Sequence, residues 1–211
     1  MNFLFDGPER SRATILLAHG AGAPMDSATM TASAKALSEA GLRVARFEFG
    51  YMAARRTEPG RTPPPRAESL MLEYKAAVNE IGVEQPLVIG GKSMGGRVAS
   101  MVADELFAAG KIIGLLCLGY PFHPPGKPQQ LRTKHLEKLA TPALICQGTR
   151  DVFGGREEVV ALSLSDRIEI LWLEDGDHDL KPRKAVSGLT AADHLRTVAV
   201  TVSRWIDGKR G

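Results

Sequence analysis

Residues 86–96 constrain the fold more than any other part of this chain. A short apolar run, residues 86–90, is typical of a buried strand and leads directly into Gly91-Lys92-Ser93-Met94-Gly95. The apolar residues that follow recur at the spacing of one helical face: Val98, Met101, Val102 and Leu106. A strand, a Gly-x-Ser-x-Gly turn and a helix in this order form a nucleophile elbow, which raises the serine hydroxyl above the sheet edge. The pattern therefore predicts an α/β fold with Ser93 as a candidate nucleophile.

The same glycine, lysine and serine also match the last part of a phosphate-binding loop. That motif needs another glycine five residues before Gly91, where Pro86 stands instead. The dinucleotide pattern G-x-G-x-x-G cannot be aligned with His19-Gly20-Ala21-Gly22 either. We therefore exclude the nucleotide-binding alternatives and expect no cofactor.

Predicted strands and helices alternate along the chain, which is typical of a mostly parallel sheet with helices on both faces. The predicted strands are residues 13–18, 42–47, 86–90, 112–118, 143–147 and 168–173. The predicted helices are residues 26–40, 66–81, 156–164 and 191–207, together with the helix after the elbow. Because no linker interrupts this alternation, we expect residues 1–211 to form one compact, doubly wound α/β domain without a large cap.

Composition argues against several classes of protein. The net charge of +3 is too small to indicate nucleic acid, and no apolar run reaches the roughly 18–20 residues of a membrane span. Residues 1–6 lack the basic start and apolar core of a secretory signal. Cys117 and Cys146 lie in apolar runs, so we expect reduced core thiols. These features predict a cytoplasmic protein with a small-molecule partner and neither a nucleic-acid nor a membrane partner.

A serine nucleophile needs a histidine base and an acid that orients the base. Asp151 follows the predicted strand 143–147, and His178 follows the predicted strand 168–173. Both should therefore lie at the carboxyl edge of the sheet with Ser93, in the chain order Ser, Asp, His. Capping of the helix near Arg156 is an alternative role for Asp151. Three other acids stand too close in sequence to His178 to face its ring and are typical of turns: Asp175, Asp177 and Asp179.

The segment His19-Gly20-Ala21-Gly22 ends the first strong strand and resembles the His-Gly turn that supplies a backbone donor to an oxyanion. We assign the two N–H donors to Met94 and Ala21, with Gly22 as the alternative to Ala21. His19 is then structural. A glycine-rich turn without this function is the other interpretation.

The remaining histidines differ in their expected roles. His123 lies in a loop expected to overhang the site and, with Lys92, is a candidate for substrate contact. His135 and His194 are expected at the surface. Because the histidines and cysteines lack metal-ligand spacing, we expect no metal site.

Basic residues gather around the loop after the predicted strand 42–47. They are Arg46, Arg55, Arg56, Arg61 and Arg66, with Lys92 and Lys127 elsewhere in the chain. One interpretation is a solvated basic surface. The other is that these cations steer anionic substrates toward the site.

Four segments together resemble the small, dienelactone-hydrolase-like α/β hydrolases: residues 17–22, 91–95, 148–151 and 176–178. Residues 120–128 are similar to the branch that includes testis-expressed protein 30 and the hydrolase-like domain of a lysine-acetyltransferase regulatory-complex subunit. Dienelactone hydrolase itself uses a cysteine nucleophile, so lactone cleavage is not implied. The resemblance implies a serine hydrolase of small esters or related acyl compounds. A non-catalytic interaction or acyl-binding module with the same fold is the alternative.

Overall fold

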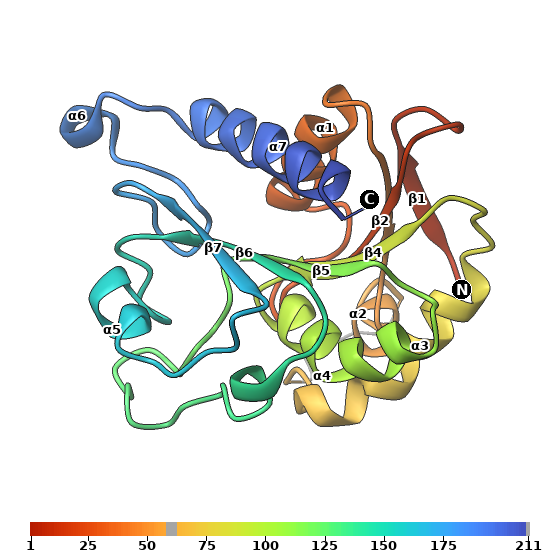
Figure 1. Ribbon diagram of the computed structural model, residues 1–211, viewed down its shortest axis with the longest axis horizontal. Helices are drawn as coiled ribbons and strands as arrows, with labels where there is room; N and C mark the ends of the chain where they lie inside the picture. Colours follow the sequence, from red (N-terminus) through yellow and green to blue (C-terminus); the bar gives the residue numbers. More distant parts are fainter. Residues whose placement is uncertain (58–62, 210–211) are drawn as a thin grey trace.

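The computed structural model describes residues 1–57 and 63–209. At its centre lies a seven-stranded sheet of order β1-β3-β2-β4-β5-β6-β7 (Figure 1). From β3 across to β7 neighbouring strands are parallel, and β1 pairs antiparallel with β3 at the edge. The strands are β1 (Phe3–Asp6), β2 (Thr14–Ala18), β3 (Arg43–Phe47), β4 (Leu87–Lys92), β5 (Gly114–Leu118), β6 (Ala143–Gly148) and β7 (Ile168–Leu173). This arrangement confirms the predicted doubly wound, mostly parallel sheet.

Helices cover both faces of the sheet, with α1 and α7 on one side and α3 and α4 on the other (Figure 1). The helices are α1 (Ala28–Glu39), α2 (Gly50–Ala54), α3 (Met71–Glu80), α4 (Met94–Ala108), α5 (Arg156–Val160), α6 (Lys184–Ser187) and α7 (Ala191–Asp207). Two 3₁₀ turns are also present, η1 (Ala67–Leu70) and η2 (Leu136–Lys138). None of the described helices is both long and apolar enough to cross a lipid bilayer.

Alternate residues of the central strands enter two apolar clusters, one on each face. In β2, Leu16 packs into the cluster beneath α3 and α4, whereas Ile15 and Leu17 pack toward α1 and α7. In β5, Cys117 packs into the cluster beneath α3 and α4, whereas Leu118 packs toward α1 and α7. Because both faces are buried, these strands are continuous apolar runs rather than alternating patterns.

Several elements differ from the sequence-based prediction. The edge strand β1 was not predicted because its four residues are half-buried or exposed and carry no apolar period. Its partner strand holds it through ladder bonds and through an ion pair of 2.8 Å between Arg46 and Asp6. The short helix α2 lies within the predicted loop. The predicted helix 66–81 divides into η1 and α3, and the predicted helix 156–164 ends at Val160.

A buried hydroxyl joins the helical layer to the strand that carries the elbow. Tyr74 of α3 is fully buried, and its Oη accepts the Gly90 N–H at 2.9 Å. The same hydroxyl lies 2.6 Å from Gly90 O and 3.1 Å from Leu16 O, the two acceptors available to its proton. Tyr74 therefore supplies hydrogen bonds to β4 three residues before Ser93.

Replacing Tyr74→Phe should lower the free energy of unfolding by about 1–3 kcal/mol, because the buried Gly90 N–H loses its partner. The phenylalanine ring keeps its packing against Phe47, whose ring centroid lies 5.2 Å away. Urea denaturation measures the change. An unaltered midpoint and slope would contradict this role of the hydroxyl.

Candidate active site

Ser93 occupies a strained turn between β4 and α4. Its φ of 52° and ψ of −116° are rare for a residue with a side chain. The flanking glycines are required because β2 passes close by. A Cβ at Gly91 would lie 2.5 Å from Ala18 O, and a Cβ at Gly95 would meet the same oxygen at still shorter range. The Ser93 N–H donates to Leu118 O at 3.1 Å, which ties the elbow to the end of β5.

The structure brings Ser93, His178 and Asp151 into one chain of hydrogen bonds. Ser93 Oγ lies 2.8 Å from His178 Nε2, and His178 Nδ1 lies 2.8 Å from Asp151 Oδ2. Because a carboxylate only accepts, the Asp151 contact assigns the ring proton to Nδ1 and leaves Nε2 to accept from the serine. The three residues follow β4, β7 and β6, so they meet at the carboxyl edge of the sheet.

Asp151 is buried and receives three hydrogen bonds. Besides His178 Nδ1, the donors are Gln147 Nε2 at 2.9 Å and the Phe153 N–H at 2.8 Å. Gln147 also donates to Tyr120 O and accepts the Tyr120 N–H, so it links the acid to the loop after β5. The N-cap of α5 is Gly155, which leaves Asp151 out of the capping role. Gln147 is not among the predicted site residues, and its signal in the sequence is one amide at the end of an apolar run.

Lys92, a candidate for substrate contact, holds the loop that carries the base. Its side chain is buried, and Nζ donates to His178 O at 2.7 Å while lying 3.5 Å from Asp179 Oδ1. Burial lowers the pKa of the Lys92 ammonium, against the opposing effect of Asp179. The residue beside the nucleophile therefore positions the histidine loop.

The His-Gly turn after β2 is fixed through His19. His19 is fully buried, with Nδ1 2.6 Å from Gly20 O and Nε2 accepting the Phe49 N–H at 3.2 Å. Burial lowers the pKa of His19, which favours the neutral ring that these two contacts require. Of two pockets that meet at Ser93, described below, Ala21 lines both, Gly22 lines one and Met94 lines the other. The assignment of Met94 and Ala21 as oxyanion donors stays a prediction.

The three rival aspartates have other partners. Asp175, with a φ of 55°, accepts from the backbone N–H of Arg183 at 2.6 Å and from its Nε at 2.9 Å. Asp177 Oδ1 accepts the backbone N–H groups of Asp179 and Lys181, each at 2.9 Å. These contacts are typical of turn residues, as the sequence predicts.

The other three histidines lie away from the reacting atoms. His123 is buried, with Nδ1 2.8 Å from Pro124 O, and it lines neither pocket beside Ser93. The prediction that His194 lies at the surface is wrong, because this side chain is buried and Nδ1 lies 2.8 Å from Leu180 O. His135 lies partly at the surface, half-buried, with Nε2 2.8 Å from Ser100 Oγ.

Most of the predicted basic group has structural partners. Arg46 is buried and binds Asp6, Met25 O and Thr31. Arg56 pairs with Glu48 and Asp26, and the Arg55 guanidinium lies over the Tyr51 ring at 5.1 Å. Arg61 lies outside the described residues. Within residues 1–57 and 63–209, no three His, Cys, Asp or Glu side chains are grouped to hold a metal ion.

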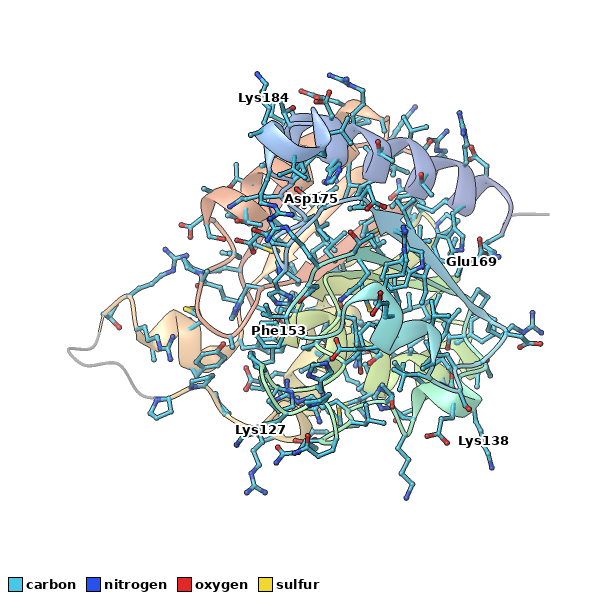
Figure 2. The ribbon with its side chains drawn as sticks, turned by 90° about the vertical axis from the view of Figure 1, so that its left-hand side faces the viewer. Lys127, Lys138, Phe153, Glu169, Asp175 and Lys184 are labelled. Atoms are coloured by element: carbon cyan, nitrogen blue, oxygen red, sulfur yellow. The ribbon has the colours of Figure 1, made fainter. Side chains whose placement is uncertain are left out.

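Two pockets meet at Ser93. The first, which we call the His178 pocket, has a volume of about 350 Å³ and is lined by residues 20–23, the start of α1, Lys92, His178 and Asp179. The second, which we call the arginine pocket, has a volume of about 360 Å³ and is lined by residues 64–68, Met94, Pro121, Arg97 and Arg132. Ala21, Ser93 and Phe153 line both pockets. Phe153, near the centre of Figure 2, also packs on His178 with ring centroids 4.1 Å apart.

A family model described as an alpha/beta hydrolase domain matches residues 11–207. The chain belongs to this α/β hydrolase family. The matched residues include the His-Gly turn and also Ser93, Asp151 and His178. With this match, the predicted α/β-hydrolase family is confirmed, whereas the narrower position beside testis-expressed protein 30 stays a prediction.

Solved structures share the fold of this α/β hydrolase over almost its whole length. An alpha-beta serine hydrolase homologue from Coxiella burnetii is 21% identical with a TM-score of 0.68, covering 96% of this chain and 89% of that chain. A dienelactone hydrolase from Anabaena variabilis is 19% identical with a TM-score of 0.68, covering 98% and 90%. Est1E from Butyrivibrio proteoclasticus, with ferulic acid bound, is 15% identical with a TM-score of 0.69, covering 99% and 94%. At these identities the likeness shows a common fold.

Replacing Asp151→Asn should lower kcat for a short p-nitrophenyl ester by about 10⁴, because the histidine loses the charge that fixes its tautomer. Asp177→Asn is the matched control and should have a far smaller effect, because its carboxylate bonds to its own turn and lies 3.8 Å from Arg150 Nη2 rather than against the His178 ring. Steady-state kinetics of both variants measure the difference. A larger loss of kcat in Asp177→Asn than in Asp151→Asn would show that Asp151 is not the acid.

Acid should weaken the fold through Asp175. The hydrogen bonds from Arg183 lower the pKa of Asp175 to about 2, below its ordinary value of 3.8. The unfolded chain therefore binds the proton first, and this contribution to stability, complete above about pH 5, is lost as the pH falls toward 2. Urea denaturation between pH 7 and 3 should show a smaller acid loss in Asp175→Asn than in the wild type. Asp166→Asn, at an exposed carboxylate, is the control, and equal losses in all three proteins would contradict the prediction.

Proposed function

We propose that this α/β hydrolase cleaves small carboxylic esters or related acyl compounds through Ser93, His178 and Asp151. The observation that carries the proposal is the pair of 2.8 Å contacts that connect Ser93 Oγ through the imidazole to a buried carboxylate. A serine hydroxyl is a weak nucleophile until a neighbouring base accepts its proton. The strained elbow, which lifts Ser93 into the junction of two pockets, supports the same function.

In the first half of the reaction, Ser93 Oγ attacks the ester carbonyl carbon while its proton passes to His178 Nε2. The negative charge then lies on the carbonyl oxygen, where the N–H groups of Met94 and Ala21 stabilise it. The bond to the alcohol oxygen breaks, and His178 Nε2 gives its proton to that oxygen. Asp151 keeps the ring oriented and stabilises the imidazolium.

In the second half, water attacks the acyl group on Ser93 Oγ and loses a proton to His178 Nε2. The acyl–oxygen bond breaks, the proton returns to Ser93 Oγ, and the acid leaves. These steps consume one ester and one water and release one acid and one alcohol. Lys92 acts as a positioning residue in this scheme, since its ammonium holds His178 O.

Replacing Ser93→Ala should abolish hydrolysis of short p-nitrophenyl esters, because removal of such a serine usually costs on the order of 10⁶ in kcat. A fluorophosphonate probe should label the wild type once, at Ser93, and should not label the variant. Ser38→Ala, at a half-buried position of α1 that lines neither pocket, is the matched control and should retain both activity and labelling. Residual activity of a few hundredths of the wild type in Ser93→Ala would overturn the assignment, as would absence of labelling in the wild type.

A further inference from the structure

The arginine pocket carries an excess of positive charge beside Ser93. Arg66, Arg97 and Arg132 line it, and among its lining residues Glu68 is the one carboxylate. Arg97 Nη2 pairs with Glu68 Oε1 at 2.6 Å, which balances one of the three guanidinium groups. Within the described part of the chain, no carboxylate lies at ion-pairing distance from Arg66 or Arg132. Glu68 also attracts Arg66 and Arg132, but one carboxylate against three guanidinium groups leaves two positive charges in excess in this wall.

The backbone holds Arg132 in place in this wall. The Arg132 N–H donates to Phe122 O at 2.8 Å, and Arg132 O accepts the Tyr120 hydroxyl at 3.0 Å, so the backbone at this position is held on both sides. Partial burial, with the nearby charge of Arg97, lowers the pKa of the Arg132 guanidinium. Arg97 Nε is buried and has no hydrogen-bond partner. An anion in this pocket would relieve the repulsion between like charges.

The His178 pocket differs in charge. Its cation, Lys92, already donates to His178 O and lies 3.5 Å from Asp179, so the two charges balance within the wall. The remainder of this pocket consists largely of small and apolar side chains at the His-Gly turn and the start of α1. An anionic group on a substrate is therefore favoured in the arginine pocket and not in the His178 pocket.

The position of the base decides which half of an ester enters each pocket. His178 Nε2 must deliver a proton to the leaving alcohol, and His178 lines the His178 pocket alone. The alcohol half therefore faces the His178 pocket. The acyl half extends from the carbonyl carbon in the other direction, past Met94 and into the arginine pocket.

We infer that this hydrolase prefers esters whose acyl chain ends in a carboxylate, which Arg66, Arg97 and Arg132 bind. The inference rests on the proposed function at Ser93. Arginine suits this role because its planar fork donates two parallel hydrogen bonds to a carboxylate. Hydrolysis then converts a monoester of a dicarboxylic acid and water into the free dicarboxylic acid and a neutral alcohol.

Three esters test the inference in a pH-stat assay: monoethyl adipate, ethyl hexanoate and the butanoyl ester of glycolate. The first two differ by a carboxylate in place of a methyl group at the end of the acyl chain, and the third carries its carboxylate on the alcohol. The wild type should favour monoethyl adipate over ethyl hexanoate by about tenfold or more in kcat/KM. The glycolate ester should show no such preference over ethyl hexanoate. A preference of the same size for the glycolate ester would overturn the acyl-side placement.

Arg132→Gln should remove most of that preference, and Arg66→Gln, at an exposed position, provides a second variant if the first does not fold. Lys127→Gln is the matched control because it removes one charge from the same loop as Arg132 but outside the pocket. Lys127 is exposed and lies below Phe153 in Figure 2. Both esters are measured on one preparation, so any misfolded fraction cancels from their ratio. Equal ratios in Arg132→Gln, Arg66→Gln and the wild type would overturn the inference, and loss of the preference in Lys127→Gln would indicate long-range steering instead.

Binding of adipate, measured by titration calorimetry, separates this inference from the proposed function. Wild-type protein should bind adipate at least about tenfold more tightly than Arg132→Gln does, and Lys127→Gln should bind as the wild type does. If no ester is cleaved and Ser93 is not labelled, the esterase proposal fails, while this titration still decides whether the carboxylate site exists. No difference between the wild type and Arg132→Gln would overturn the site.

Discussion

The close approach between the elbow and the end of β2 determines the rest of the active site. Neither Gly91 nor Gly95 has room for a Cβ, because Ala18 O stands against both positions and His19 O also stands against Gly95. This contact forces Ser93 into its strained turn and brings the His-Gly segment beside the hydroxyl. The nucleophile and the proposed oxyanion donors therefore come from two adjacent strands whose distance is set by backbone alone. Rigid supports of this kind give a site the precision that catalysis requires.

The acid and the base depend on a second close approach, between the ends of β6 and β7. A Cβ at Gly148 would collide with Gly176 O, and the Arg150 N–H donates to that same oxygen at 3.1 Å. Lys92 then reaches across from β4 to His178 O. Backbone carbonyls thus connect the three loops. These connections hold the side chains of Ser93, His178 and Asp151 in contact with one another. The small residues at these crossings support the site although none of them lines either pocket.

The sequence predicts those features that the local backbone imposes. The glycines around Ser93, the buried central strands and the position of Asp151 and His178 after strand ends all follow from pattern and strand direction. Features that depend on distant partners could not be predicted. β1 exists through pairing with β3, and His194 is buried because Leu180 O approaches it from another loop. The arginine pocket could not be predicted from the sequence either, because Arg66, Arg97 and Arg132 come from three separate segments.

The two pockets share only Ala21, Ser93 and Phe153 among the described residues, and the rest of their walls comes from different elements. One wall is built by the turn after β2 and the first turn of α1, and the other by residues 64–68, α4 and the loop after β5. Substitutions in one wall can therefore accumulate without disturbing the other. During divergence of this fold, preference for the alcohol and preference for the acid can change separately, while the reacting groups between them stay constant.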